Sequence, residues 1–287
     1  MKKILVTGGA GFIGANLIKQ LKGKGLHVVS IDNYSTGSKY NEIEGVDYFD
    51  LDIEEIFTLK DTDFDLCFHF AAQSRVQPSF DNPLESVRVN ITGTTRVMEW
   101  AKINNVKVIY AGSSSKHHDP SDSPYAMTKF LGEEICKLYK KSFNVNVEIA
   151  RFYNVYGPLE PLDEKFGNVI GIWQVKVKNK MPLPIVGDGN QKRDFTHVLD
   201  IVDGLLRIAN SEIKHKDAWE IGTGVNYTIN KLFQMFKEKF NVDSIYIPDQ
   251  KGNYRATLRV NDDLINLLNW QPKDRLREYI ANLNSSI

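Results

Sequence analysis

A tyrosine and a lysine four residues apart form the pair in this sequence best suited to proton transfer. Tyr125 and Lys129 lie near the start of residues 124–143, whose apolar spacing predicts a helix, so both side chains project from one face. A phenol has a pKa near ~10 and becomes a base near neutral pH only where a cation stabilises the phenolate. Lys129 can supply that cation, as can an oxidised nicotinamide. A pair on a solvated helix surface has the same spacing and is the alternative interpretation.

Three consecutive serines follow an apolar segment and add hydroxyl groups to this pair. Ser113, Ser114 and Ser115 come soon after residues 106–110, which read as a buried strand. The carboxyl ends of parallel strands open onto the ligand crevice, so Ser113 can meet both the Tyr125 hydroxyl and a substrate hydroxyl. A serine-rich turn without chemistry is the alternative.

A glycine-rich loop near the start of the chain is suited to binding a pyrophosphate. Gly8, Gly11 and Gly14 lie between the apolar residues 3–7 and the helix-like residues 14–22. Glycines let the backbone approach the phosphates closely, and the helix start supplies N–H groups and the positive end of its dipole. The position between a strand and a helix therefore predicts a dinucleotide site.

Two carboxylates at strand ends refine the identity of that dinucleotide. Asp32 ends the apolar residues 27–31 and can accept hydrogen bonds from both ribose hydroxyls, while it would repel a 2′-phosphate. NAD is therefore favoured over NADP, and a turn carboxylate before Asn33 is the alternative. Asp52 ends another short strand-like run and can reach the adenine amino group, although a surface carboxylate fits equally well.

Alternating strand-like and helix-like segments must position these residues. Such alternation predicts a parallel sheet covered on both faces by helices, which is a doubly wound α/β (Rossmann) fold built from right-handed crossovers. The predicted strands are residues 3–7, 27–31, 66–71, 106–110 and 145–151, and the predicted helices are residues 14–22, 87–103 and 124–143.

The second half of the chain is more irregular, because prolines and glycines interrupt the alternation after residues 157–158. Helix-like residues 198–210 and 229–240 still alternate with strand candidates at 219–221 and 244–247. We expect an NAD-binding domain over residues 1–155, with a returning segment near 194–225. A smaller, irregular α/β substrate-binding lobe is expected mainly over residues 156–287.

The composition excludes several kinds of partner. The 287 residues carry 36 Lys+Arg against 36 Asp+Glu, so no general attraction to nucleic acid or to an anionic membrane is expected. No apolar run approaches the length of a membrane span. Cys67 and Cys136 have no Cys or His neighbour at metal-ligand spacing, so no metal site is expected, and two distant thiols fit a cytoplasmic protein.

In this order along the chain, the glycine loop, Asp32, Ser113 and the Tyr-Lys pair resemble an extended short-chain dehydrogenase/reductase. The resemblance is strongest to NAD-dependent nucleotide-sugar epimerases and dehydratases, particularly the UDP-glucose/UDP-galactose 4-epimerase group. It extends to residues 32–37 (DNYSTG), 69–73 (HFAAQ) and 89–94 (VNITGT). It implies that NAD is bound by Gly8, Gly11, Phe12, Ile13, Gly14, Asp32, Asn33, Ser35, Thr36, Asp52, Ile53, Phe70, Ala71, Ala72, Gln73, Asn90, Tyr125, Lys129 and Phe152.

The second half carries the substrate-side part of the resemblance. Residues 151–158 (RFYNVYGP) are similar to the family segment whose asparagine contacts the nucleotide diphosphate, and residues 184–195 (PIVGDGNQKRDF) to the stretch that packs on the base and donates an arginine to the phosphates. The resemblance implies that a nucleotide-diphosphate sugar is bound by Ser74, Ser113, Ser114, Asn154, Asn168, Val169, Ile185, Arg193 and Arg255.

The resemblance implies epimerisation through a transient 4-keto sugar, with Ser113, Tyr125 and Lys129 as the catalytic residues. A hydride would pass from C4 to bound NAD and back. The alternatives are a dehydrogenase or reductase that releases or consumes a keto sugar, a 4,6-dehydratase, and an NAD-binding protein without turnover. The predicted helices at 90–103 and 124–143 correspond to helices that pair in many dimeric relatives. We therefore expect a homodimer, although the same apolar spacing also suits packing within one chain.

The sequence departs from the family pattern in three places. Ser113 and Tyr125 are only twelve residues apart and residues 116–119 are KHHD, so we expect a shorter, more open rim with His117 and His118 in solvent. The Asp-Glu pair that dehydratases carry after the strand-end hydroxyl is replaced by two serines, which argues against dehydration. The late phosphate-binding arginine of the epimerases falls on Gln250, and Arg255 or Arg259 is expected to replace it.

Overall fold

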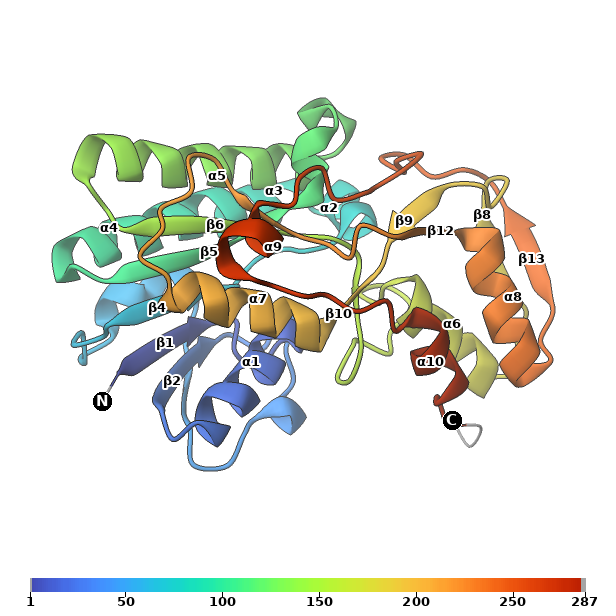
Figure 1. Ribbon diagram of the computed structural model, residues 1–287, viewed down its shortest axis with the longest axis horizontal. Coiled ribbons are helices and arrows are strands. Elements are labelled where there is room, and N and C mark those ends of the chain that lie inside the picture. Colours follow the sequence, from blue (N-terminus) through green and yellow to red (C-terminus); the bar gives the residue numbers. More distant parts are fainter. Residues whose placement is uncertain (1, 285–287) are drawn as a thin grey trace.

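The computed structural model describes residues 2–284 and is built around a seven-stranded sheet (Figure 1). The strand order is β11-β6-β5-β4-β1-β2-β3, and every neighbouring pair is parallel. This order confirms the predicted doubly wound α/β fold, since the chain starts in the middle of the sheet and builds outwards in both directions. The strands are β1 (Lys3–Thr7), β2 (His27–Asp32), β3 (Asp47–Asp50), β4 (Leu66–His69), β5 (Lys107–Ser113), β6 (Val147–Phe152) and β11 (Trp219–Ile221).

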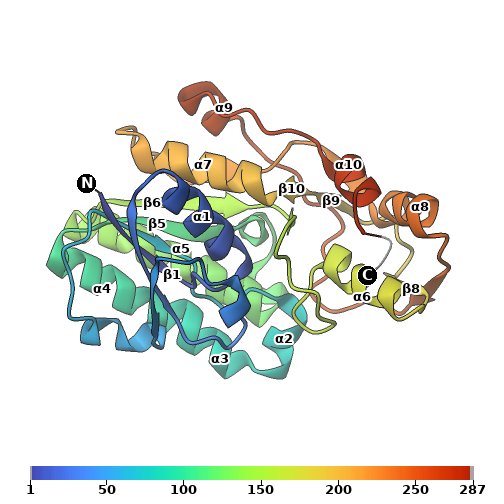
Figure 2. The same ribbon diagram turned by 90° about the horizontal axis from the view of Figure 1, so that it is seen from below.

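Helices cover both faces of this sheet, and Figure 2 shows the two layers on opposite sides of it. Alternate residues of β1 enter different cores, because neighbouring side chains of a strand point to opposite faces. Leu5 packs in the core under α4 (Thr94–Asn104) and α5 (Pro124–Phe143), whereas Ile4 and Val6 pack in the core under α1 (Phe12–Gly23) and α7 (Val198–Asn210). Both faces are therefore apolar, as buried parallel strands require.

Helix α5 begins where local chemistry dictates. The Ser123 hydroxyl accepts a hydrogen bond from the Ala126 backbone N–H at 3.0 Å, and Pro124 occupies the first helical position, where no N–H is needed. The helix ends at Asn144, which has a left-handed backbone (φ 56°). These caps fix the helix start, and with it the orientation of Tyr125 and Lys129.

The segment between α2 (Val76–Asp81) and α4 differs from the prediction of one continuous helix over residues 87–103. The structure has α3 (Pro83–Val87), a single π-helical turn over Arg88–Gly93, and only then α4. Such turns insert one extra residue and often lie at functional sites. This one contains Asn90, whose side chain reaches the loop after β4.

The second lobe is built from three small two-stranded sheets and three helices that share a core (Figure 1). The strand pairs are β7 (Val155–Tyr156) with β10 (Thr196–His197), β8 (Leu183–Val186) with β13 (Ser244–Ile247), and β9 (Lys192–Asp194) with β12 (Asn226–Thr228). The helices are α6 (Val169–Lys178), α8 (Ile229–Phe240) and α10 (Leu276–Ala281), and the short α9 (Asp263–Leu268) packs near α7.

The predicted helices at 198–210 and 229–240 are confirmed as α7 and α8, and the strand candidates at 219–221 and 244–247 are β11 and β13. The division into an NAD-binding domain and a substrate lobe stays a prediction. Within residues 2–284, no helix combines the length and the apolar character that crossing a membrane requires.

Candidate active site

A cavity of about 820 Å³ lies at the carboxyl ends of the sheet strands, between the sheet and the second lobe. Residues from both halves of the sequence line it, and nearly all of the residues expected to bind a cofactor or substrate are among them. The lining includes Gly8, Gly11, Phe12, Ile13, Gly14, Asp32, Asn33, Ser35, Thr36, Ile53, Phe70, Ala71, Ala72, Gln73, Ser74, Ser113, Ser114, Tyr125, Lys129, Phe152, Asn154, Val169 and Arg193.

The glycine loop has no room for side chains. Gly8 has φ +72°, and a Cβ there would lie 2.7 Å from the Ala71 nitrogen. A Cβ on Gly14 would lie 2.2 Å from the Gly8 carbonyl oxygen. The backbone of this loop therefore forms an open cradle at the start of α1, which fits the pyrophosphate of a dinucleotide.

Asp32 anchors the cradle from the end of β2. Its carboxylate accepts hydrogen bonds from the backbone N–H groups of Ala10 at 2.9 Å and of Tyr34 at 2.8 Å. Burial raises the pKa of Asp32, while these N–H donors oppose the rise. The carboxylate faces the cavity next to the glycine loop, where a ribose bound beside the pyrophosphate would meet it.

Asn90 lies behind the cavity and is not one of its lining residues. Its side-chain carbonyl accepts from the Gln73 N–H at 2.8 Å, and its amide donates to the Gln73 carbonyl at 3.0 Å. Both backbone groups of Gln73 are thus held by one side chain. Asn90 therefore positions the loop after β4 rather than contacting a ligand directly.

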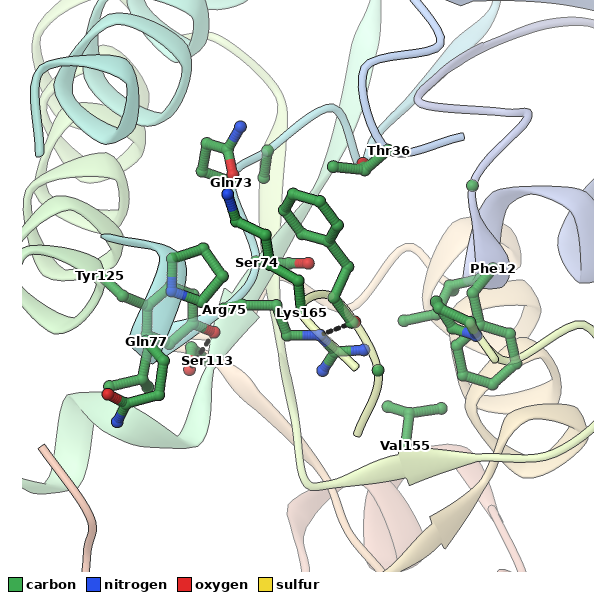
Figure 3. A pocket seen from close by; sticks show the side chains of 18 of the residues that line it. Phe12, Thr36, Gln73, Ser74, Arg75, Gln77, Ser113, Tyr125, Val155 and Lys165 are labelled. Carbon is green, nitrogen blue, oxygen red and sulfur yellow. Dashed lines mark hydrogen bonds between the residues drawn. The ribbon is translucent and has the colours of Figure 1, made fainter. Parts of the chain in front are cut away.

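Tyr125 and Ser113 meet inside the cavity, with 3.0 Å between Tyr125 Oη and Ser113 Oγ (Figure 3). Ser113 Oγ also accepts hydrogen bonds from the N–H and the hydroxyl of Ser115, at 3.1 and 2.9 Å. Ser113 Oγ has two lone pairs and one proton, so it cannot accept from all three neighbouring donors at once. Its proton can be directed to Tyr125 Oη or to an oxygen atom in the cavity. Burial raises the pKa of Tyr125, and both the hydrogen bond to Ser113 and the positive charge of Arg75 oppose this rise.

Lys129 lines the same cavity as Tyr125. Its ammonium group donates to the Ala111 carbonyl at 2.5 Å and lies 4.6 Å from the centre of the Tyr110 ring. Burial lowers the pKa of Lys129 to about 8, opposed by the charge of Glu133. The positive charge of Arg75 opposes the rise in the Tyr125 pKa, and the expected effect of Lys129 on Tyr125 stays a prediction.

Arg75 is the main functional candidate that the sequence analysis missed. It follows Ser74 in the loop after β4, lines the cavity, and donates its Nε–H to the Phe166 carbonyl at 2.6 Å. In the view of Figure 3 its side chain lies between the pair Tyr125 and Ser113 on one side and Phe12 on the other. The only sequence feature that could have indicated Arg75 is its position two residues after the HFAAQ segment at the end of β4.

Asn154, just after β6, and Arg193, in β9, line the cavity, as predicted for residues near a diphosphate. The Asn154 amide donates to Thr257 Oγ1 at 2.8 Å. The Arg193 guanidinium donates to the Tyr254 carbonyl at 2.7 Å and to the Asn253 side chain at 2.5 Å. Burial lowers the pKa of Arg193 to about 10, which still leaves it positively charged at neutral pH.

Ile185 and Asn168 differ from the prediction. Ile185 is fully buried in the core of the second lobe, because side chains alternate along β8 and only Pro184 and Val186 face the cavity. Asn168 caps α6 by accepting from the Gly171 N–H at 2.7 Å, and its amide donates to Glu160 at 2.8 Å. It borders only a smaller pocket next to the main cavity.

Asp52 is also placed outside the cavity lining. Its carboxylate pairs with Arg88 at 2.8 Å, caps the short helical turn Ile53–Thr58, and accepts from the Asn33 amide at 2.8 Å. The arginine pair holds the pKa of Asp52 below its usual value. The residue expected to reach adenine therefore has a structural partner, and its neighbour Ile53 lines the cavity instead.

Neither Arg255 nor Arg259 lines the cavity, so the expected replacements for the late phosphate-binding arginine are wrong. The Arg255 side chain is 70% exposed and forms a two-pronged pair with Asp188 at 2.8 and 2.7 Å. Arg259 donates to the Gly222 carbonyl at 2.6 Å and to the Asp262 carboxylate. Gln250, which the resemblance places at the position of the epimerases' late arginine, does line the cavity.

Both histidines after Ser113 have protein partners; His117 is exposed, as predicted, whereas His118 is only partly exposed. His117 Nε2 lies 2.9 Å from the buried Glu220 carboxylate. The His118 ring stacks on Tyr254 with 3.9 Å between ring centres and 7° between planes. Since Tyr254 comes from the second lobe, the short loop closes against that lobe and does not leave an open rim here.

Metal-binding side chains do not cluster in the described residues 2–284. Among residues 2–284, no group of three or more His, Cys, Asp and Glu side chains could hold a metal ion. Cys67 and Cys136 are buried and free of disulfide bonds, and burial raises the pKa of both thiols.

Comparisons with known proteins agree with this geometry. The family model for the NAD-dependent epimerase/dehydratase family matches residues 4–222. The chain is 31% identical to a UDP-glucuronate 4-epimerase of Thermodesulfobacterium geofontis over 96% of this chain and 92% of the relative. It resembles the structure of an epimerase of Methanothermobacter thermautotrophicus (TM-score 0.90, 30% identity, 97% and 90% of the two chains). It also resembles a UDP-glucose 4-epimerase of Thermotoga maritima solved with UDP-glucose (TM-score 0.89, 28% identity, 97% and 96%).

Proposed function

The chain belongs to the NAD-dependent epimerase/dehydratase family, and from this premise we propose that it inverts the C4 hydroxyl of a nucleotide-diphosphate sugar. The observation that carries the proposal is the hydrogen bond of 3.0 Å between Tyr125 and Ser113 inside the cavity. It brings a proton acceptor and a hydroxyl donor to one point at the carboxyl end of β5. A sugar hydroxyl bound there would touch both groups.

NAD, when bound in the glycine cradle, supplies the chemistry of taking a hydride from C4 and returning it to the opposite face. Tyr125, as phenolate, accepts the proton of the 4-hydroxyl as the C4–O bond becomes a carbonyl, and later returns this proton to the oxygen. Once Tyr125 has taken up the proton, the Ser113 hydroxyl can donate to that oxygen, which stabilises the charge on it. The reaction is balanced because proton and hydride both return to the sugar.

The nucleotide end of the substrate would lie along the second lobe. Pro184 and Val186 offer an apolar surface to a base, while Asn154 and Arg193 present an amide and a cation near the phosphates. An anchored nucleotide allows the keto sugar to turn about its link to the diphosphate, so that its other face meets the cofactor. Loss of water across C5 and C6 would need a further acid and base, and Ser114 and Ser115 at those positions are neither.

We further propose a cytoplasmic homodimer with a role in carbohydrate biosynthesis. Apolar side chains of α4 and α5 remain exposed, namely Ile103 (62%), Leu138 (52%) and Phe143 (47%). Such side chains on adjacent helices suit pairing with a second copy of the chain. The free thiols of Cys67 and Cys136 suit a reducing compartment.

A proton NMR time course of the purified protein without added cofactor tests the proposed activity. The substrates are UDP-, GDP- and dTDP-hexoses, together with UDP-glucuronate. We expect the C4 epimer of at least one to form, with no keto signal and no accumulated reduced cofactor. A keto sugar as product, or reduced cofactor in proportion to substrate, would show a dehydrogenase instead. A pentose from UDP-glucuronate would show decarboxylation, because a 4-keto uronate is a β-keto acid that can lose CO₂.

A further inference from the structure

Arg75 borders two compartments of the substrate region. It lines the main cavity together with Ser113 and Tyr125, and it also lines the smaller adjacent pocket together with Arg193 and Asn154. A nucleotide sugar has three parts in fixed order: the sugar, the diphosphate and the nucleoside. A residue between the sugar-oxidising pair and the residues expected near the phosphates lies where the sugar joins the diphosphate.

The Arg75 guanidinium has hydrogen-bonding capacity left for a ligand. Its Nε–H is donated to the Phe166 carbonyl at 2.6 Å, which fixes the plane of the group. Among residues 2–284, Nη1 and Nη2 have no hydrogen-bond or ion-pair partner, although the side chain is partly buried. A guanidinium presents up to five N–H donors in a planar fork, and this fork matches two oxygens of a phosphate group.

The other arginines near the substrate region are already engaged. Arg193 is bonded to Tyr254 and Asn253, Arg255 to Asp188, and Arg259 to Gly222 and Asp262. Arg255 and Arg259 also lie outside both cavities. Gln250, which the resemblance places at the position of a cation in related epimerases, is itself uncharged. Two negative charges of a diphosphate would thus face only Arg193 from the arginines of the second lobe.

The charges around Arg75 leave it available to an anion. Burial lowers the pKa of Arg75, and the acidic groups of Tyr125 and Glu160 oppose this change. Glu160 is itself buried and already accepts from Asn168, Gln174 and Tyr279, so it does not pair with the guanidinium. Lys165, on the loop that Arg75 contacts, adds another cation to the cavity lining.

We propose that Arg75 binds the diphosphate of the nucleotide sugar and takes over the role of the arginine that is missing at Gln250. This inference rests on the proposed function, because it needs a nucleotide-diphosphate substrate. The diphosphate would then be held from both sides of the cleft, by Arg75 from the sheet lobe and Arg193 from the second lobe. The carbonyl of Phe166 would act as the support that aims the Arg75 fork at the phosphates.

Calorimetric titration with UDP, on the protein with its bound NAD, tests this role without any sugar in the site. We expect Arg75→Gln to weaken UDP binding about 10- to 100-fold, the range for hydrogen bonds to charged groups. The UDP affinity of Arg75→Lys should lie between those of the wild type and Arg75→Gln, since lysine keeps the charge and lacks the planar fork of donors. Uridine, which has no phosphate, should bind all three proteins alike. Increasing salt should weaken UDP binding less steeply for Arg75→Gln than for the wild type.

Two control variants separate this role from a general loss of charge or of structure. Arg255→Gln removes the exposed competitor for the role, and Arg277→Gln removes an exposed arginine paired with Glu238. Both should bind UDP as the wild type does. The NAD content of Arg75→Gln should also be unchanged, because Arg75 lies outside the glycine cradle. If Arg75→Gln loses its NAD, UDP binding by Arg75→Lys is compared with that of the wild type instead.

The outcomes distinguish failure of this inference from failure of the proposed function. If the wild type binds UDP and Arg75→Gln binds it equally well, the inference is wrong and the proposed function stands. The inference is also wrong if Arg75→Gln binds UDP normally but binds UDP-glucuronate more weakly than the wild type does. That result would assign Arg75 to a sugar carboxylate. If Arg255→Gln alone weakens UDP binding, the role belongs to Arg255. If the wild type binds none of UDP, GDP and dTDP, the proposed function itself fails.

Discussion

Glu133 and Arg151 form a buried ion pair directly behind the strand end that carries Ser113. Arg151 Nη2 lies 2.7 Å from Glu133 Oε2, and both side chains are at most 2% exposed. Glu133 Oε1 also accepts from the Ser113 N–H at 3.4 Å. Arg151 continues to Glu220 at 2.9 Å, and Glu220 contacts His117. The position of Ser113 is thus linked to a charged network inside the protein.

Replacing Arg151 by Met should destabilise the fold strongly. Breaking a buried pair leaves Glu133 and Glu220 as uncompensated buried charges, and such changes typically cost about 3–5 kcal/mol. Denaturant unfolding measures this loss, and Arg151→Lys should lose less because it keeps the charge. The matched control is Arg277→Met, whose pair with Glu238 is exposed and should contribute no more than ~1 kcal/mol. Equal losses for the two Met variants would contradict a structural role of the buried network.

Replacing Tyr125 by Phe should remove most of the epimerase activity and leave the bound NAD in place. The change deletes only the hydroxyl that contacts Ser113, and losing a positioned acid–base group typically costs about 10²–10⁴-fold in rate. Epimer formation by NMR gives the rate, and the absorbance of the cofactor released on denaturation gives NAD content. Wild-type turnover by this variant would remove Tyr125 from the mechanism. Loss of NAD together with activity would mean that the hydroxyl supports the cofactor site instead.

Replacing Gly14 by Ala should abolish or strongly weaken NAD binding. The new Cβ would lie 2.2 Å from the Gly8 carbonyl oxygen and 2.7 Å from Gly9 Cα, so the cradle must distort. Gly23→Ala in the same helix is the matched control, because its Cβ would meet nothing within 4 Å. That change should leave NAD binding intact and stabilise α1 by up to ~1 kcal/mol. Normal NAD content in Gly14→Ala would contradict the assignment of this loop to the pyrophosphate.

Local signals were sufficient to predict some of these elements from the sequence. Helices α5, α7 and α8 begin and end at the predicted residues. Their starts are fixed by Ser123, His197 and Thr228, whose side chains accept hydrogen bonds from the first turn. The strands around the glycine loop were equally clear, since short apolar segments there alternate with helical spacing. These features depend on neighbours within a few residues.

Features that depend on distant contacts could not be predicted in this way. The apolar pattern of residues 87–103 does not reveal the π-helical turn, which aligns Asn90 with the distant Gln73. Arg255 reads as a free cation until its pairing with Asp188 is known, and Arg75 reads as a loop residue until Phe166 is placed next to it. His117 similarly reads as solvated until Glu220 is placed beside it by the return of β11 to the sheet.

Stability should fall as pH falls below about 6.5, in part because of two buried histidines. Burial lowers the pKa of His69 to about 3 and that of His197 to about 4, so both are neutral in the folded protein. Unfolded histidines take up protons below ~6.5. The unfolded state therefore binds more protons between pH 6.5 and about 4, and each histidine reduces stability by about 1.4 kcal/mol per pH unit in that range. Well above pH 6.5 both histidines are neutral in the folded and the unfolded state, so they do not reduce stability there.

Replacing His197 by Asn isolates one of these contributions. Asn can still cap α7, where His197 Nδ1 accepts from the Leu199 N–H, but it does not titrate. The free energy of unfolding between pH 7 and 5 should therefore depend less steeply on pH in this variant. Its overall stability should be lower as well, because the ring packs on Tyr156. An unchanged slope would show that His197 is protonated equally in the folded and unfolded states.

Replacing Leu138 by Glu should convert the proposed homodimer to a monomer. Leu138 is 52% exposed on α5, and a charge there would be buried without a partner if two copies meet through this face. Sedimentation velocity gives the mass in solution. Leu267→Glu on α9 is the control, because this side chain is equally exposed (51%) and lies on another face. A wild-type monomer, or a Leu138→Glu dimer, would place the α5 face outside any interface.

The pairing of β11 with β6 also sets the order in which the molecule can be completed during its synthesis. When residues 1–155 have left the ribosome, β6 forms the outer strand of the sheet, with unpaired N–H and C=O groups along one edge. Residues 219–221 cover part of this edge only after much of the second lobe has also been made. Until then the nascent chain presents an edge that can pair with other strands and lead to aggregation. The interval between translation of β6 and β11 is therefore the period in which a chaperone would help this protein most.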